Sequence, residues 1–344
     1  MDTKLLPADE AGIREAARLL RQGQVVGIPT ETVYGLAANA LDPEAAARIY
    51  AAKGRPSDNP LIVHIADYAM IDQLVAGKPL LADRLAEAFW PGPLTMIFPK
   101  GEQVPFATTG GLDTVAVRMP SHPAAQALIR ECGLPLAAPS ANLSGRPSPT
   151  RASHVFHDME GRIPLILDGG ECQVGVESTV IAVGEESVRL LRPGGITVEM
   201  LSQYCDVIVD DGVLHQIREG QTVLSPGMKY KHYAPKASVI LLDGSPEQFV
   251  RYVNTHAEEG VFAMASKEQQ PRLNVPVLCF GGEEDEASQA HALFDCLRAC
   301  DENGAKTVYV RLPKQTGVGL AVLNRLLRAA AFHIIKLDEE EQHG

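Results

Sequence analysis

The stretch KGRPSDNPLIVHI, residues 53–65, joins the end of a predicted helix to a short buried strand. The helix is expected over 43–53, because Asp42 is a good capping residue and Pro43 suits the first helical position. The strand is LIVHI, 61–65, an apolar run of strand length, and the glycine and prolines before it mark a turn. A helix followed at once by a buried strand is typical of an α/β fold.

The same alternation of helices and short apolar runs extends in both directions along the chain. Further helices are expected at 13–22, 80–90 and 123–132. Apolar runs predict strands at 24–28, 94–98, 114–118, 164–168, 178–183 and 187–191. Strands that alternate with helices favour an open, largely parallel or mixed sheet. We therefore predict an α/β fold in which helices cover a twisted open sheet.

The pattern changes between about 205 and 237, where the chain is polar and rich in turn residues and ends in TVLSPGMKYKHYAPKA. A second α/β pattern follows, with strands expected at 238–242, 260–265, 275–280 and 307–311 and helices at 246–257, 287–300 and 318–332. This indicates a smaller, Rossmann-like, doubly wound domain. We expect a larger domain over 1–210, a linker over 211–236 that closes as a lid, and a C-terminal domain over 237–344.

Composition and charge exclude several classes of protein. The 344 residues are 45% hydrophobic and carry a net charge of −12, which argues against binding nucleic acid by bulk charge but allows a local basic pocket. The net charge is −8 over residues 1–230 and −4 over the rest, so neither part is a basic module. No run of about 18 apolar residues predicts a membrane span, and the N-terminus lacks a signal-peptide pattern. We expect a cytoplasmic protein.

The sequence also lacks the common metal, nucleotide and nucleophile motifs. None of its six cysteines forms a C-x-x-C pair, which excludes zinc-ribbon and thioredoxin-like sites. Cys296 and Cys300 are expected to be buried or half-buried thiols on one helix face. Gly317 and Gly319 precede a predicted helix without a third glycine, which favours a tight turn over dinucleotide binding. The acidic run EEDE, 283–286, is expected to be solvated.

Polar residues instead gather where the strands of the larger domain end. The segment IPTETVYGLAANA, 28–40, contains three hydroxyl side chains, Thr30, Thr32 and Tyr34, and is interpreted as a ligand-binding loop. The segment AAPSANLSGRPSPT, 137–150, is dense in Ser, Asn, Gly and Pro, a composition that lets backbone amides approach an anion. Lys53 and Arg55 suit a phosphate clamp, although they also suit the end of a helix. Arg118 ends an apolar strand and needs an anion, either a ligand or an internal partner.

Together these segments resemble the YrdC-like family of threonylcarbamoyl-adenylate synthases, in its longer two-domain form. The matching segments are PTETVYGLAANA, KGRPSDNPLIVHI, FWPGPLT, VAVRMPSHP, APSANLSGRPSPT, GVESTVI, LLRPGGI and the linker SPGMKYKHYAP. The resemblance implies a YrdC-like fold for the larger domain. It also implies a reaction that joins L-threonine, bicarbonate or carbon dioxide, and ATP to give threonylcarbamoyl-AMP and pyrophosphate. The product would serve the tRNA threonylcarbamoyl-transferase proteins that modify the adenosine beside the anticodon.

The resemblance also implies roles for single residues. L-Threonine would be bound by Thr32, His64, Arg118, Ala138 and Ser178, with Arg118 on its carboxylate. ATP would be bound by Arg55, Asn59, Thr114, Ser140, Ser148, Arg192 and a linker tyrosine, either Tyr230 or Tyr233, with Tyr230 preferred. Lys53 and Arg55 would face the phosphates as the catalytic cations. Mg²⁺ would arrive with ATP, since it often binds through substrate phosphates.

Other functions are compatible with parts of the pattern. An RNA-binding module without adenylation activity is one, although the net charge predicts only weak or indirect contact with tRNA. A carbamoyl-adenylate enzyme of hydrogenase maturation is another, but those proteins are larger and carry zinc-finger cysteine pairs. The C-terminal domain is expected to be a scaffold that anchors the lid, with a regulatory binding module as the alternative.

Overall fold

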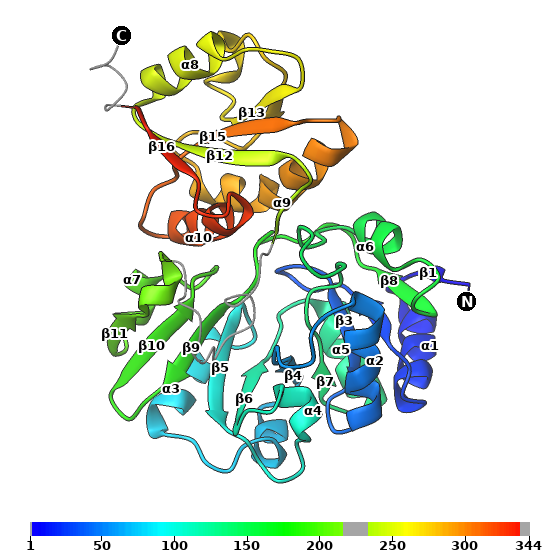
Figure 1. Cartoon of the computed structure of the whole chain (residues 1–344). Helices are drawn as coiled ribbons and strands as arrows, with labels where there is room; N and C mark the ends of the chain where they lie inside the picture. The colour runs from blue at the N-terminus through cyan, green and yellow to red at the C-terminus, as the bar shows by residue number, and fades with distance from the viewer. Residues whose placement is uncertain (1, 216–232, 338–344) are drawn as a thin grey trace. The chain divides into compact units, whose positions relative to one another are not determined.

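The computed structural model describes residues 2–215 and 233–337 (Figure 1). By its internal contacts the chain divides into two units. The first unit holds Met1–Ser144 and Ser148–Lys229, and the second holds Gly145–Pro147 and Tyr230–Gly344. Among the described residues, no helix is long and apolar enough to cross a membrane.

The first unit is built on one mixed sheet of eleven strands within the described residues. Its strand order is β1-β8-β2-β3-β7-β4-β6-β5-β9-β10-β11. The strands are β1 (Lys4–Pro7), β2 (Val26–Ile28), β3 (Gly35–Asn39), β4 (Ile62–His64), β5 (Leu94–Pro99), β6 (Thr114–Arg118), β7 (Leu136–Ala137), β8 (Leu165–Asp168), β9 (Thr179–Val183), β10 (Ser187–Arg192) and β11 (Asp206–Val209). The predicted twisted, mixed sheet is confirmed.

Helices of the first unit follow local sequence signals. They are α1 (Glu10–Arg21), α2 (Pro43–Lys53), α3 (Leu80–Phe89), α4 (Phe106–Thr109), α5 (Pro123–Cys132), α6 (Ala152–Met159), α7 (Val198–Leu201) and the 3₁₀ helices η1 (Tyr68–Gln73) and η2 (Asp211–Val213). At the start of α2 the Asp42 carboxylate accepts a hydrogen bond from the Glu44 amide, and left-handed Gly54 ends the helix. The prediction of a helix over 43–53 is therefore confirmed to the residue.

One part of the sequence prediction for the first unit is wrong. The segment 28–40 was expected to be a loop, but Gly35–Asn39 forms strand β3, which pairs antiparallel with β2 and β7. Its residues, GLAAN, are small and lack the β-branched side chains that mark a strand in a sequence. The strand forms because its neighbours bury it, and the hydroxyl-rich residues 29–34 before it do form a loop.

The second unit is a smaller sheet of five parallel strands within the described residues. The strands are β12 (Ser238–Asp243), β13 (Val261–Ala265), β14 (Val277–Cys279), β15 (Thr307–Arg311) and β16 (Ile334–Lys336), in the order β14-β13-β15-β12-β16. Helix α8 (Pro246–Thr255) covers one face, and α9 (Glu286–Glu302) and α10 (Gly319–Ala329) cover the other (Figure 1). The short 3₁₀ helix η3 (Gln270–Arg272) follows β13. The predicted doubly wound architecture is confirmed.

Smaller predictions for the second unit also hold. Cys296 and Cys300 are buried free thiols on α9. Gly317 has a positive φ of 55°, and α10 starts at Gly319, so the two glycines form a turn and a helix start. The strand β16 was not predicted: the expected helix over 318–332 ends before it, and its three residues are too short a run to indicate a strand.

Residues 145–147 belong to the second unit although the chain around them belongs to the first. The Gly145 carbonyl accepts a hydrogen bond of 3.1 Å from the Ala234 amide. The Pro147 carbonyl accepts one of 2.7 Å from Nη2 of Arg298. Residues 145–147 are thus held by Ala234 and by Arg298 of α9.

Gly194 provides a test of the packing around the end of β10. A Cβ placed on it would collide with the Thr179 amide and lie 2.6 Å from the Glu177 carbonyl oxygen. These neighbours are backbone atoms and cannot move aside cheaply. We expect Gly194→Ala to lower the free energy of unfolding by about 1–3 kcal/mol, the usual cost of overpacking, as measured by denaturant unfolding.

The matched control is Gly77→Ala, where an added Cβ meets no atom within 4 Å. It should change stability by less than about 0.5 kcal/mol, as at most surface positions. Equal effects of the two substitutions would contradict the packing assigned to Gly194.

Candidate functional site

Three neighbouring strands at the centre of the large sheet, β4, β6 and β5, carry polar side chains that lie side by side. Strands β4 and β6 are parallel, and His64 pairs in register with Arg118 at their carboxyl ends. Strand β5 runs antiparallel to β6 and places Thr95 opposite Arg118. Residues in register on adjacent strands share a face of the sheet. His64, Arg118 and Thr95 therefore form a polar row in an otherwise apolar region.

Arg118 is the centre of this row and is almost fully buried, with 4% of its surface exposed. Its Nη1 donates to Oγ1 of Thr32 at 2.9 Å, and its Nε donates to the Gly92 carbonyl at 3.3 Å. Its Nη2 lies 2.6 Å from Oε1 of Glu31 in a buried ion pair. The sequence left open whether the anion beside Arg118 is a ligand or an internal side chain. In the structure it is an internal one, the carboxylate of Glu31.

The Glu31 carboxylate is held in its charged form by this pair. Burial raises the pKa of Glu31, but the Arg118 charge and hydrogen bonding outweigh burial, so that the pKa lies below its ordinary value. Glu31 is 4% exposed. A buried carboxylate and a buried guanidinium thus compensate one another next to Thr32.

A second group of polar residues surrounds Ser178, just before β9. The Ser178 hydroxyl lies 2.8 Å from Oγ1 of Thr95. Arg192 donates from Nε to the Ser178 carbonyl at 3.0 Å and from Nη2 to the Ser178 hydroxyl at 3.1 Å. The pairing of β9 with β10 shifts register between Leu190 and Arg192, a bulge that re-aims the Arg192 side chain. Through Thr95, this group continues the row that contains Arg118.

Ser148 joins the same region through a residue that the sequence prediction did not include. Its hydroxyl donates to Oε1 of Glu177, and both residues are buried. Glu177 directly precedes Ser178. The structure therefore brings together four of the predicted residues, Thr32, His64, Arg118 and Ser178, with Arg192 and Ser148 linked to them.

Lys53 is hydrogen-bonded to a different loop, the one that contains Ser140 and Asn142. Lys53 is 2% exposed, and its ammonium donates to the carbonyls of Ser140 and Asn142, the latter at 2.7 Å. The Ser140 hydroxyl donates to the side-chain oxygen of Asn142. Ala138, before this loop, donates its amide to the Ile62 carbonyl at 2.9 Å, which ties the loop to β4. Contact between Lys53 and a phosphate stays a prediction.

Arg55 and Asn59 lie in the turn between α2 and β4. Nη2 of Arg55 donates to the carbonyls of Asn59 at 3.3 Å and Pro60 at 3.1 Å, and these bonds brace the turn. Thr114 begins β6 and lies four positions before Arg118, which is about 13 Å along a strand. Thr114 is therefore not part of the Arg118 group.

Only one of the two candidate tyrosines of the linker lies within the described residues. Tyr230, the preferred one, lies outside the described residues. Tyr233 is buried within the second unit, where its ring lies 5.4 Å from that of Phe294 and 5.8 Å from the guanidinium carbon of Arg325. Its role toward ATP stays a prediction.

Family models match both units. A model described as "Telomere recombination", of the Sua5, YciO and YrdC proteins, covers residues 18–194. A model described as "Threonylcarbamoyl-AMP synthase, C-terminal domain" covers residues 196–331. The chain belongs to the threonylcarbamoyl-AMP synthase family. Members of this family are enzymes of the nucleotidyltransferase type.

Relatives match the chain over nearly its whole length. It is 47% identical to the threonylcarbamoyl-AMP synthase of Bacillus subtilis (strain 168), over 97% of both chains. It is 45% identical to that of Pyrococcus abyssi, over 96% of this chain and 97% of the other. The crystal structure of P. abyssi Sua5 complexed with L-threonine matches with a TM-score of 0.90 at 43% identity, over 97% of this chain and 98% of that one. These matches favour the synthase over the hydrogenase-maturation alternative.

Sequence reasoning missed three members of the site in this synthase. Glu31, Thr95 and Glu177 contact Arg118, Ser178 and Ser148 respectively. Glu31 stands beside Thr32 in PTETV, so a charged residue inside a hydroxyl-rich segment was a usable signal. Thr95 sits within an apolar strand, LTMIF, and only the register of β5 against β6 reveals its place.

His64 provides a test of how deeply the site is buried. Burial lowers the pKa of His64 to about 3, and the nearby Arg118 charge lowers it in the same direction. Its Nδ1 lies 3.2 Å from the Ile62 carbonyl, which can only accept, so Nδ1 donates. The imidazole is therefore neutral at neutral pH.

A lowered pKa in the folded state makes stability depend on pH in one direction. The unfolded chain binds a proton at His64 below pH about 6.5, but the folded chain does so only near pH 3. The contribution of His64 is thus complete above pH about 6.5 and is lost as the pH falls toward 3. We expect His64→Gln to reduce the slope of unfolding free energy between pH 4 and 6 by about 1.4 kcal/mol per pH unit.

The control is His157→Gln on α6, an exposed histidine, which should leave that slope nearly unchanged. Urea unfolding at a series of pH values measures both variants. An unchanged slope in His64→Gln would mean that the folded protein protonates this imidazole as readily as the unfolded chain does.

Proposed function

We propose that this chain condenses L-threonine, bicarbonate or carbon dioxide, and ATP into L-threonylcarbamoyl-AMP, with release of pyrophosphate. The product then supplies downstream threonylcarbamoyl-transferase proteins that modify tRNA beside the anticodon. The observation that carries the proposal is the buried Arg118, which ends a central strand between His64 and Thr95 and donates to the Thr32 hydroxyl. A related protein of nearly the same length is known in complex with L-threonine, which supports the choice of amino acid.

The carboxylate of threonine is proposed to bind Arg118. Both terminal nitrogens of its guanidinium now contact one short segment, Glu31 and Thr32. An incoming carboxylate has the same charge and shape as the Glu31 side chain, so it can take the place of Glu31 on Arg118, while the protonated amine of threonine pairs with the displaced Glu31. The hydroxyls of Thr32 and Ser178 and the neutral imidazole of His64 then offer hydrogen bonds to the amine and hydroxyl of threonine.

The chemistry that follows needs position and charge more than a protein nucleophile. The threonine amine adds to carbon dioxide and loses a proton, which gives a carbamate. A carbamate oxygen attacks the α-phosphorus of ATP, and the bond to the bridging oxygen of pyrophosphate breaks. Cations that neutralise the phosphates accelerate such a transfer. Arg55, Lys53 and Arg192 are proposed for this task.

Mg²⁺ is proposed to enter with ATP. Among the described residues, no group of three or more His, Cys, Asp or Glu side chains is placed to hold a metal ion. A magnesium ion carried by the phosphates of ATP would need no such group, and it would withdraw charge from the leaving pyrophosphate. The chain's own residues then have to orient the α-phosphate toward the carbamate and keep water away.

The direct test is pyrophosphate release from ATP, Mg²⁺ and bicarbonate, with and without L-threonine. We expect release that depends on both threonine and bicarbonate. L-Serine and L-valine serve as controls, because each lacks one feature of the threonine side chain. A site that binds the hydroxyl should discriminate strongly against valine. Release at equal rates without an amino acid would refute the proposed reaction.

A single substitution tests the role of Arg118. We expect Arg118→Met to lower kcat/KM for threonine by about 100- to 1,000-fold, since removal of a buried charge partner costs about 2–5 kcal/mol. ATP binding in the absence of threonine should change little.

The matched control is Arg189→Met on β10, whose side chain is 50% exposed and pairs with Asp210 at 3.5 Å. It should leave kcat/KM within about twofold of the parent. An Arg118→Met protein that is folded and retains the parent KM for threonine would remove Arg118 from the threonine site.

A further inference from the structure

The topology of the second unit creates a crevice at one edge of its sheet. All five strands are parallel, so their carboxyl ends meet at one edge. Strand β12 leads into α8 on one face, and its neighbour β15 leads into α10 on the other (Figure 1). Where adjacent strands send their connections to opposite faces, open α/β sheets bind ligands.

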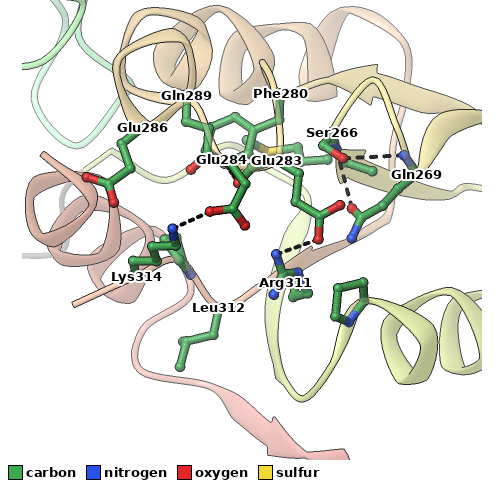
Figure 2. Close-up of a pocket in the computed structure, with 14 residues that line it drawn as sticks. Ser266, Gln269, Phe280, Glu283, Glu284, Glu286, Gln289, Arg311, Leu312 and Lys314 are labelled. Carbon is green, nitrogen blue, oxygen red and sulfur yellow. Dashed lines mark hydrogen bonds and ion pairs between the residues drawn. The ribbon is translucent and has the colours of Figure 1, made fainter. Parts of the chain in front are cut away.

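A cavity of about 240 Å³ lies at this edge (Figure 2). It is smaller than the roughly 300–1,000 Å³ of drug-sized sites, so it suits a small metabolite. Its walls come from the ends of β13 and β15, from the loop after β14 and from the starts of α8 and α9. Every one of these segments belongs to the second unit.

Gln269 supplies an unmet hydrogen-bond donor in this cavity. It is 3% exposed, and its Oε1 accepts from the Ser266 amide at 3.4 Å. Its Nε2 has no hydrogen-bond partner among the described residues. In Figure 2 the side chain points toward Glu283 and Arg311. A buried donor without a partner is costly, so an acceptor from a ligand would stabilise it.

Arg311 repeats the arrangement seen at Arg118. Each is the last residue of a similar strand, TVAVR in β6 and TVYVR in β15. Arg311 pairs through Nη2 with Oε1 of Glu283 at 3.1 Å, as Arg118 pairs with Glu31. The Arg311 and Glu283 side chains are 29% and 22% exposed, so a ligand can reach them.

The charges in the cavity select for a ligand that carries both signs. A simple anion at Arg311 would displace Glu283 and leave it unpaired, and a simple cation would do the same to Arg311. A zwitterion can take both partners at once. Phosphate groups are disfavoured because the helix starts are already capped: Glu286 accepts from the Gly319 amide of α10 at 3.0 Å, and Asp285 caps α9.

We propose that this cavity binds a small zwitterion of the α-amino-acid class. Its carboxylate contacts Arg311 and Nε2 of Gln269, and its ammonium contacts Glu283. Met264, Phe280 and Leu312 offer apolar surface for its side chain. This site is separate from the proposed threonine site, since all its residues lie in the C-terminal sheet and its connections.

The test uses the full chain and thermal-shift measurements followed by calorimetry. The probes are the L-α-amino acids other than L-threonine, each at 10 mM. For any amino acid that stabilises the protein, its methyl ester and its N-acetyl form are measured as well. We expect at least one amino acid to raise Tm measurably, and both modified forms to lose the effect, because each lacks one of the two charges.

Variants locate the binding. We expect Arg311→Met and Gln269→Leu each to weaken binding of that amino acid at least tenfold. The matched control is Lys306→Met, an exposed cation just before β15 at the opposite edge of the sheet, which should bind normally. Circular dichroism confirms that each variant is folded.

Several results would overturn the proposal. They are the absence of any stabilising amino acid, equal stabilisation by the ester or N-acetyl form, and binding that survives in both Arg311→Met and Gln269→Leu. Stabilisation by ATP that is lost in Arg311→Met would instead assign the cavity to a nucleotide. None of these readouts uses pyrophosphate release, so failure here and failure of the proposed reaction are distinguishable.

Discussion

The ion pair between Arg118 and Glu31 is the constraint on which the arrangement of the first unit depends. A guanidinium at the end of a central strand is buried, and a buried charge requires a partner. Glu31 provides it at 2.6 Å, and Thr32 adds a hydrogen bond. These two contacts fix the loop 29–34 over the sheet, and the chain then enters β3. One buried cation thereby determines where the hydroxyl-rich loop lies.

The same pair explains how a carboxylate ligand could be selected. Breaking a buried ion pair is costly unless the departing group is replaced by an equivalent one. A ligand without a carboxylate cannot replace Glu31, so the ion pair between Arg118 and Glu31 stays intact. A ligand with a carboxylate can take the place of Glu31 on Arg118. The neutral His64 beside Arg118 adds no second positive charge, so one carboxylate is enough to balance the group. In the proposed exchange, the internal partner Glu31 would thus favour a ligand that carries a carboxylate.

Sequence patterns predicted those parts of the structure that local signals determine. Asp42, Pro43 and Gly54 fixed α2 to the residue, and the apolar run 114–118 gave β6 and the position of Arg118 at its end. What sequence patterns missed depends on tertiary packing. The small residues of β3 carry no strand signal, and Thr95 meets Ser178 only through strand register. The run EEDE was expected to be solvated, yet the Glu283 side chain is only 22% exposed because Arg311 on another element pairs with it.

Each unit has an arginine–glutamate pair at the end of a strand. The two pairs differ in burial, and burial determines how strongly each pair can interact with a ligand. Arg118 and Glu31 are about 95% buried, so the proposed exchange of one carboxylate for another would take place in a low dielectric, where pairing is strong and selective. Arg311 and Glu283 are about three-quarters buried, and water screens their charges. A zwitterion that binds there would gain less from each charge and depend more on Gln269, a deeply buried polar residue that lines the cavity. The more buried pair, Arg118 and Glu31, suits a substrate that must be held in place during a reaction. The more exposed pair, Arg311 and Glu283, suits a ligand that exchanges freely with solution.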